Sequence, residues 1–476
     1  MEVETERTKP VAVFMAFGTK GDVYPIAAIA AAFASDQRQY QVVLITHSAH
    51  ESLRCHLAEK HVSYLPISSP PVLSIHQKHD TTGSVELPLS LQKKLFSGEH
   101  RKECLSVVET IFGSGPSMDG DFIVINFFAL EGWSLAELFR VRCMVAAPYV
   151  VPYSAPSSFE RQFKKEYQHL YRYLHEPNLR KVGWKDVIHW MWPLFTEHWG
   201  SWRCDHLNLS AFPFTDPVTG LPTWHDRPLS PRLLLLAIEH SGDLYTNVEM
   251  CPTHVHLQYF LKTPTPMPPV FIGLNSIGSM GFLKNPQAFL RILESVLKIT
   301  TYRFILFTAG YKPLDAAIRA IAADSSSHMT HKQINDDCVS LFHERLFCFS
   351  GSIPYMWLFS GCAAAIHHGG SGTTAAALLA GIPQVLCPFM LDQFYWAERM
   401  FWLGVASEPL KRSHLLPEES DDETIEEAAK MLSRVIHDTL SPEIRERAVE
   451  ISERISLEDG VSNAVRYIKE EIGCSS

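Results

Sequence analysis

Long apolar runs are missing from this 476-residue chain. A helix that spans a bilayer needs about 20 consecutive apolar residues, and no segment reaches that length. The first ten residues, MEVETERTKP, are polar and lack the apolar region of a secretory signal. We therefore expect a cytoplasmic protein, for which peripheral contact with a membrane surface stays open.

Paired cysteine and histidine spacings are also missing. The ten cysteines are scattered without a CxxC pair, and the 23 histidines form neither HExxH nor a Cys/His zinc pattern. Structural zinc sites and small disulfide-bonded domains depend on such regular spacings. The sequence therefore predicts reduced cysteines and no bound metal ion.

An excess of basic charge, which nucleic-acid binding requires, is absent as well. The 42 Lys and Arg residues are outnumbered by 52 Asp and Glu residues, which gives a net charge of −10. Because the phosphate backbone attracts basic surfaces, we expect no nucleic-acid partner. The hydrophobic content of 46% is ordinary for a globular protein, and the length suffices for two to three domains.

The first part of the chain alternates apolar runs with helical segments, as a parallel α/β sheet does. Val11–Phe17, Val42–Thr46 and Val62–Ile67 are typical of buried strands. Pro25 is expected to begin the helix after the first strand, since proline is tolerated in the first helical turn. The glycine fingerprint GxGxxG and its acidic ribose-binding partner are absent, which disfavours an NAD-binding function.

Aromatic residues are concentrated between residues 159 and 209. This segment contains five tryptophans, namely Trp184, Trp190, Trp192, Trp199 and Trp202. Packing in a core is the favoured interpretation for most of them. Walls of a site for a bulky apolar molecule, or contact with a membrane surface, are the alternatives.

A proline-rich segment, TPTPMPP at residues 263–269, gives the clearest linker signal. Proline fixes the backbone and removes hydrogen-bond donors, so this segment cannot continue a helix or a sheet. We therefore divide the chain into residues 1–262 and residues 263–476. Strands of the second part are predicted at Val270–Leu274, Arg303–Phe307, Leu346–Ser350, Ala363–Ile366 and Gln384–Cys387.

The most informative stretch is AAAIHHGGSGTTAAALLAGIPQVLCPFMLDQ, residues 363–393. A glycine-rich turn between a strand and a helix presents bare N–H groups and the positive end of the helix dipole, which suits a phosphate. His367 or His368 could add a further donor to an anionic oxygen. Asp392 and Gln393 open the next helix at the same edge of the sheet, where they could bind sugar hydroxyls. These turns together predict a nucleotide-sugar site.

The runs HHGGSGTT, AGIPQVLCPF and DQFYWAERM resemble the donor-binding motif of family 1 UDP-glycosyltransferases, and within them the sterol 3-β-glucosyltransferase-like branch. The runs FGTKGDVYPIAAIA and WPLFTEHWGSWR support this resemblance, which spans Val11 to Gly404. It implies the α/β GT-B fold, in which two Rossmann-like domains face each other and a C-terminal helix crosses back to the first. Residues 1–262 would bind the acceptor and residues 263–476 the UDP-sugar donor.

The resemblance also implies a reaction. It is an inverting, metal-independent transfer of a hexose, with glucose expected, from a UDP-sugar to a hydroxyl of a lipophilic acceptor such as a sterol. No cofactor is expected, because the UDP-sugar is a co-substrate, and we expect a monomer. Glycosylation of a plant-type phenolic or terpenoid is one alternative, and a non-catalytic UDP-sugar-binding scaffold is another.

The resemblance assigns the catalytic base to Asp22, in the loop after the first strand. This carboxylate would take the proton of the acceptor hydroxyl. The alternative is that Asp22 caps the following helix. Asp119 and Asp121 could orient a base, although solvation at the start of a strand is the favoured interpretation for both.

The donor-binding residues that the resemblance implies are Ser276, Ile353, His367, Gly369, Ser371, Gly372, Thr373, Asp392 and Gln393. Ser276 aligns with the serine of the family pattern GFGSM, with Ser279 as its rival, and Asn275 replaces a glycine. Ile353 would act through its backbone at the uracil edge. The run Thr308-Ala309-Gly310 stands where the branch more often has Ser-Gly-Trp, so a donor contact of that Trp is missing.

Overall fold

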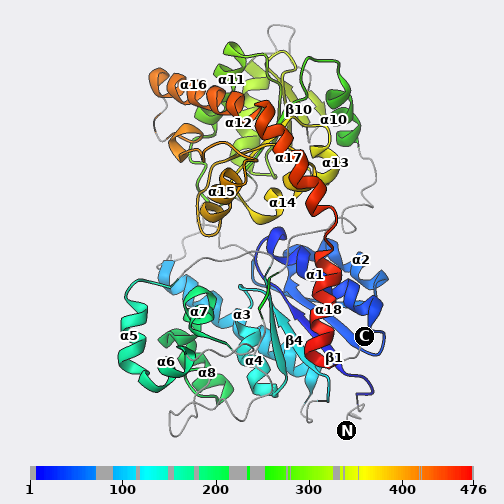
Figure 1. Ribbon diagram of the computed structural model, residues 1–476, viewed down its shortest axis with the longest axis vertical. Coiled ribbons are helices and arrows are strands. Elements are labelled where there is room, and N and C mark those ends of the chain that lie inside the picture. The colour runs from blue at the N-terminus through cyan, green and yellow to red at the C-terminus, as the bar shows by residue number, and fades with distance from the viewer. Residues whose placement is uncertain are drawn as a thin grey trace, which may run out of the picture. The chain divides into compact units, whose positions relative to one another are not determined.

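The computed structural model consists of two compact units (Figure 1). Unit 1 comprises Met1–Val72, Asp80–Leu244 and Gly460–Ser476, and unit 2 comprises Leu73–His79 and Tyr245–Asp459. Within them the structure describes residues 7–70, 89–113, 118–147, 155–175, 182–213, 233–235, 252–274, 277–278, 280–324, 333–335, 338–351, 353–417, 419 and 421–473.

Unit 1 is built on a six-stranded sheet of order β3-β2-β1-β4-β5-β6, in which every pair is parallel. Its strands are β1 (Val11–Met15), β2 (Gln41–His47), β3 (Val62–Ile67), β4 (Phe122–Ile125), β5 (Arg142–Ala147) and β6 (Leu233–Leu235). The strands expected near residues 11, 42 and 62 are confirmed. Their apolar runs are continuous because helices cover both faces of a parallel sheet.

The helices of unit 1 include one from the far end of the chain. They are α1 (Lys20–Asp36), η1 (Ser48–Leu53), α2 (Arg54–Glu59), α3 (Leu89–Phe112), α4 (Glu131–Phe139), α5 (Phe159–Glu166), α6 (Gln168–His175), α7 (Trp184–Asp186), η2 (Val187–Met191), η3 (Trp192–Phe195), α8 (Glu197–Leu207) and α18 (Gly460–Ile472). The terminal α18 packs beside α1, where Lys469 Nζ lies 3.0 Å from Asp36 Oδ2 (Figure 1). The expected helical crossover is confirmed.

The first helix begins five residues before the predicted start at Pro25. Thr19 is the N-cap, and its backbone N–H and its hydroxyl both donate to the Asp22 carboxylate, each over 2.8 Å. This capping interaction fixes the first turn. Pro25 lies inside the helix. The prediction from proline was wrong because side-chain capping determined the boundary.

The aromatic segment forms a core, as expected for most of its tryptophans. Trp184, Trp190 and Trp202 are buried within the main apolar cluster of unit 1. The Arg101 guanidinium lies 3.9 Å from the ring centre of the partly buried Trp199. Trp192 is half-buried, and it lines a cavity of this unit.

Arg203 is the largest fully buried side chain, and its guanidinium joins three groups of unit 1. It donates to the Ser210 carbonyl oxygen (2.8 Å), Ser134 Oγ (3.0 Å) and Glu137 Oε1 (3.0 Å). We expect Arg203→Met to lower the free energy of unfolding by about 3–5 kcal/mol, because Glu137 loses its buried cation. Urea denaturation measures this loss. The double variant with Glu137→Gln should recover part of it, and a loss below about 1 kcal/mol would contradict the assignment.

Unit 2 contains a seven-stranded sheet of order β13-β12-β7-β8-β11-β10-β9, parallel except at the edge formed by β10 and β9. Its strands are β7 (Val270–Gly273), β8 (Phe304–Phe307), β9 (Gln333–Asn335), β10 (Cys338–Leu341), β11 (Leu346–Phe349), β12 (Ala364–His367) and β13 (Gln384–Leu386). Its helices are α10 (Pro252–Lys262), α11 (Pro286–Ile299), α12 (Lys312–Asp324), α13 (Tyr355–Phe359), α14 (Ser371–Leu379), α15 (Gln393–Trp402), η7 (Arg412–His414), α16 (Asp422–Thr439) and α17 (Pro442–Ile455). All five strands predicted here are present.

Helix α10 precedes the proline-rich segment yet packs within unit 2. Its Leu257 and Phe260 are buried in one cluster with Phe347 of β11. Arg303 donates to the Phe260 carbonyl oxygen over 2.6 Å. The compact units therefore divide between Leu244 and Tyr245, whereas the sequence division after residue 262 falls after α10. The binding roles given to the two halves stay predictions.

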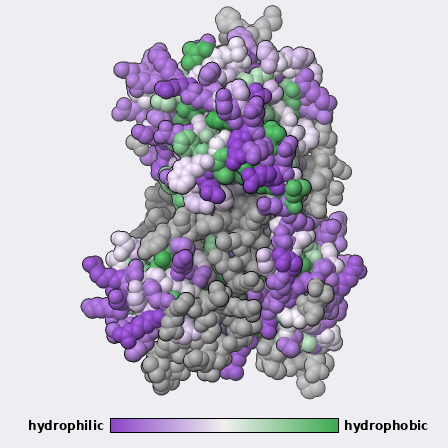
Figure 2. Space-filling model, in the orientation of Figure 1, coloured by the Kyte–Doolittle hydropathy of each residue, from purple (hydrophilic) through white to green (hydrophobic). Residues whose placement is uncertain are grey.

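The surface over α16 and α17 is largely hydrophilic (Figure 2). Helix α16 begins after Asp421, whose carboxylate accepts a hydrogen bond from the Thr424 N–H over 2.9 Å.

A search of the described residues for membrane-spanning helices finds none with the required length and apolar character.

Candidate functional site

Two strand-to-helix turns of unit 2 meet at one edge of its sheet. Strands β12 and β13 are parallel, so their carboxyl ends lie side by side. The first turn leads into α14 and the second into α15. Gly369, at φ +85°, lies so close to the second turn that a Cβ atom there would be 3.0 Å from the Gln393 carbonyl oxygen. The predicted adjacency of these two turns is confirmed.

The N-terminus of α14 has the chemistry of an anion-binding site. Its N-cap is Gly370, which has no side chain with which to cap the helix. The N–H groups of a first helical turn have no acceptor within the helix, and they carry the positive end of its dipole. Those groups belong to Ser371, Gly372 and Thr373, the residues that the sequence assigned to the donor phosphates.

His367 is hydrogen-bonded within the first turn. Its side chain is fully buried, with Nε2 2.9 Å from Gln384 Oε1 and with Nδ1 accepting the Gly369 N–H over 3.1 Å. Nδ1 must be unprotonated, so Nε2 carries the hydrogen that Gln384 accepts. Burial lowers the pKa of His367 to about 4. Both ring nitrogens are engaged within the fold, and the prediction that His367 contacts the donor stays a prediction.

The neighbouring His368 is placed differently, with one ring nitrogen beside the start of α14. Its Nδ1 is buried without a hydrogen bond of normal geometry to any described residue, although the Gly273 backbone lies near enough to the ring to favour its protonated form. Its Nε2 lies against the start of α14, since a Cβ atom on Gly370 would be 2.5 Å away. Burial, and then the nearby His367, lower its pKa to about 3, so the ring is neutral at pH 7. His368 is thus the imidazole beside the N-terminus of α14.

Asp392 and Gln393 define the second turn. Asp392 is the N-cap of α15, and its Oδ2 accepts a hydrogen bond from Trp396 Nε1 over 3.1 Å. Burial raises the pKa of Asp392 to about 6. Gln393 Oε1 accepts the N–H groups of Phe389 (2.9 Å) and Met390 (3.1 Å), which orders the turn. The amide NH₂ of Gln393 remains as the donor end of that side chain.

The remaining donor predictions concern Ser276 and Ile353. Ser276, with Asn275 and Ser279, lies outside the described residues. The Ile353 side chain is buried in an apolar cluster, which agrees with a role through its backbone alone. That role stays a prediction.

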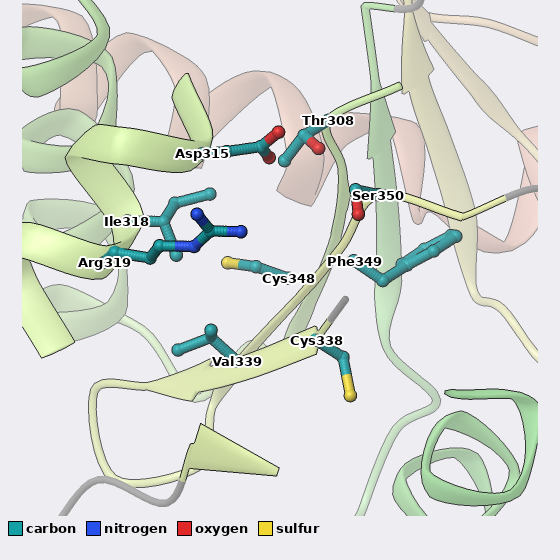
Figure 3. Close-up of a pocket in the computed structure, with 9 residues that line it drawn as sticks. All are labelled: Thr308, Asp315, Ile318, Arg319, Cys338, Val339, Cys348, Phe349 and Ser350. Atoms are coloured by element: carbon teal, nitrogen blue, oxygen red, sulfur yellow. The ribbon is translucent and has the colours of Figure 1, made fainter. Parts of the chain in front are cut away.

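A small cavity lies at the carboxyl ends of β8 and β11 (Figure 3). Thr308, Asp315, Arg319 and Ser350 lie around it, and Thr308 Oγ1 is buried without a hydrogen bond to any described residue. Its volume of about 20 Å³ suits a single water molecule rather than a ligand.

In unit 1, Asp22 lies at the carboxyl end of β1, where open α/β sheets place their sites. Its Oδ2 accepts the two hydrogen bonds from Thr19, so the capping role is real. Asn126 Nδ2 donates to the Asp22 carbonyl oxygen (3.1 Å) and to the Phe17 carbonyl oxygen (2.8 Å), which fixes this loop. The role of Asp22 as a base stays a prediction.

Asp121 lies at the opposite, amino end of the same sheet. Its carboxylate accepts the N–H groups of Val11 (2.7 Å) and Met118 (2.8 Å) and pairs with Arg7 (3.1 Å). These contacts hold the starts of β1 and β4 together. Asp121 is therefore a buried structural residue, so the interpretation of solvation was wrong for it, whereas Asp119 is exposed, as that interpretation expected.

A partly buried polar cluster near the carboxyl ends of β2 and β3 was not predicted. Ser69 Oγ lies 2.7 Å from His100 Nδ1 and 3.3 Å from His47 Nδ1, and His100 Nε2 lies 3.9 Å from Glu131 Oε2. Burial, and then the adjacent His100, lower the pKa of His47 to about 4. The only sequence signal was that His47 ends a strand.

Comparison with known proteins adds relatives to this geometry. Residues 346–455 match the erythromycin biosynthesis protein CIII-like C-terminal domain. Sterol 3-beta-glucosyltransferase UGT80B1 of Arabidopsis thaliana is 30% identical over 198 residues, which cover 42% of this chain and 26% of that protein. The sterol 3-beta-glucosyltransferase of Kluyveromyces lactis is 41% identical over 126 residues, 26% of this chain and 9% of that protein. The matches thus cover about a quarter or less of each relative.

A solved structure extends the likeness of fold to nearly the whole chain. CalG4, the calicheamicin glycosyltransferase, superposes with a TM-score of 0.56 at 17% identity. The match covers 98% of this chain and 99% of CalG4. The predicted two-domain α/β architecture is confirmed.

Proposed function

We propose that this chain is a family 1 glycosyltransferase that transfers glucose from a UDP-sugar to a hydroxyl of a lipophilic acceptor such as a sterol; the partial matches to sterol 3-beta-glucosyltransferases and the shared fold support this. The observation that carries this proposal is the contact between the α14 turn and the Asp392 turn. One turn offers donors for a diphosphate, and the other offers a carboxylate and an amide for sugar hydroxyls.

The donor is bound by unit 2 in this proposal. The diphosphate lies at the N-terminus of α14, where the first-turn N–H groups and His368 donate to its oxygens. Asp392 accepts from the sugar hydroxyls, and the Gln393 amide donates to them. His367 orders the turn through Gly369 and Gln384.

Asp22 acts as the base in the chemical step. Its carboxylate takes the proton of the acceptor hydroxyl as that oxygen attacks the anomeric carbon of the sugar. The bond from this carbon to the diphosphate oxygen breaks, and the configuration inverts. Negative charge grows on the departing UDP, where the α14 N–H groups and His368 stabilise it. No step in this proposal requires a metal ion.

The direct test is a donor and acceptor screen with mass spectrometry. Purified protein is incubated with UDP-glucose and with sterols, terpenoids or phenolics, and each acceptor is examined for an added hexose. Glucose on a sterol supports the proposal, whereas glucose on phenolics or terpenoids alone would favour the alternative acceptors. Calorimetric binding of UDP-glucose without transfer to any acceptor would favour a scaffold, and no binding at all would reject the donor site.

Asp392→Ala should raise the KM for UDP-glucose about 10-fold or more, the loss expected for a charged hydrogen bond, while UDP affinity changes less than about twofold. The carboxylate with a pKa of about 6 gains a proton as the pH falls, and it then loses its charge. The wild-type KM should therefore rise between pH 7 and pH 5. Steady-state kinetics measure both effects.

Asp392→Asn is the matched control, because its KM should not change over the same pH range. Equal weakening of UDP and UDP-glucose in the alanine variant would show that Asp392 does not contact the sugar.

A further inference from the structure

A cavity in unit 1 is walled by aromatic side chains. It has a volume of about 640 Å³ and is lined by residues of α5, η3, α8 and the segment after α8. Its aromatic walls are Phe159, Phe163, Tyr167, Trp192, Phe195 and Phe212. Sites for small molecules usually enclose about 300–1,000 Å³ between mostly apolar walls, so this cavity has the size and lining of one.

The walls are held by contacts among themselves. The Phe159 and Trp192 ring centres are 6.4 Å apart at 68°, and those of Tyr167 and Phe212 are 4.6 Å apart. Gly200 permits the close approach of α8 to the following segment, since a Cβ atom there would lie 3.2 Å from the Ala211 carbonyl oxygen. The rings therefore have defined orientations toward a ligand.

The charged groups of the cavity have a single sign. Glu166, Glu197 and Asp205 line it, and the described lining includes no lysine, arginine or histidine. Glu166 accepts a hydrogen bond from Gln162 over 3.1 Å. Glu197 and Asp205 are exposed, and neither forms an ion pair with another residue in the part of the chain that the structure describes. Aromatic faces and carboxylates both attract a cation, and the carboxylates repel an anion.

We propose that this cavity binds an apolar ligand that carries a cationic ammonium group. The apolar body packs against the six aromatic rings, and the ammonium group lies against a ring face near Glu197 and Asp205. None of the lining residues is among those proposed for sugar transfer. The inference therefore stands independently of the transfer reaction.

A cysteine at the cavity provides a direct readout. Cys204 lines the cavity and is exposed, whereas the exposed Cys55 lies on α2 and serves as the internal control. Alkylation by N-ethylmaleimide is followed at both thiols by peptide mass spectrometry. The probes are (1-naphthylmethyl)trimethylammonium, its uncharged carbon isostere 1-neopentylnaphthalene, and 1-naphthylacetate.

The ammonium probe should slow alkylation of Cys204 about 10-fold at saturation and leave Cys55 unchanged. The uncharged isostere should need about 10-fold higher concentration for the same protection, because it lacks the attraction to the rings and carboxylates. The acetate should give none. Equal protection by the uncharged isostere, protection by the acetate, or no protection by the ammonium probe would each overturn the proposal.

Two variants test the parts separately. Replacing both exposed carboxylates, as Glu197→Gln with Asp205→Asn, should remove the preference for the ammonium probe and keep the protection by its uncharged isostere. Ser201→Trp should fill the cavity from the exposed face of α8 and abolish protection by both. If Ser201→Trp fails to fold, the carboxylate variant still decides, because an unchanged preference for the cation would contradict the proposal.

Discussion

Asp22→Asn should lower kcat by about 10²–10⁴-fold, the range that general-base catalysis contributes, while UDP affinity stays within about twofold. The amide cannot take the acceptor proton, but its oxygen can still accept the hydrogen bonds that Asp22 receives from Thr19. Transfer of glucose in a single-turnover assay and calorimetric titration with UDP measure the two quantities.

The dual role of Asp22 calls for a control that disturbs the helix cap alone. Thr19→Ala removes the hydroxyl that donates to Asp22 Oδ2 and keeps the carboxylate. It should cost about 0.5–2 kcal/mol of stability with only a modest change in kcat. If Asp22→Asn retains wild-type turnover, or if Thr19→Ala loses as much turnover as Asp22→Asn does, Asp22 is not the base.

The second large effect is expected from His368. His368→Ala should lower kcat by about 10²–10³-fold, because the departing UDP loses a prearranged donor at the start of α14. The melting temperature measured alongside should show that the variant is folded. Nucleotide-sugar donors with poorer and better leaving groups separate the chemical step from binding. The loss of kcat in His368→Ala should be smaller with the donor that has the better leaving group.

His367 provides the comparison within the same motif. Because its ring joins Gln384 and the Gly369 N–H inside the fold, His367→Ala should mainly reduce stability, by about 1–3 kcal/mol for the polar groups left unpaired. A larger loss of turnover in folded His367→Ala than in His368→Ala would reverse our assignment of the two histidines.

The sequence predicted what lies close together along the chain. The order β12, turn, α14, β13, turn, α15 falls within about 40 residues, and its apolar runs, glycines and caps determine it locally. The adjacency of the two turns follows from parallel pairing of neighbouring strands, which needs no further information. That is why the arrangement of the two turns was predicted largely as it is found.

What the sequence missed depends on distant partners. His367 and His368 are equivalent in the sequence, and contacts within the fold distinguish them, among them the pairing of His367 with Gln384 across the sheet. The start of α1 was predicted at Pro25, whereas the Thr19–Asp22 cap sets it earlier. Capping was only one of the two roles that the sequence allows for Asp22. The Ser69–His100 contact joins residues from separate elements, for which a single sequence carries no periodic signal.

The packing of α18 against α1 limits how this protein can be truncated or joined to another in a chimera. Unit 1 is discontinuous in the chain, so a fragment that stops at residue 244 would lack the helix whose Lys469 pairs with Asp36. A chimera that exchanges donor specificity should therefore graft residues 245–459 as an internal insertion and keep the native tail. Exchanging the whole carboxyl-terminal half would give α1 a foreign neighbour.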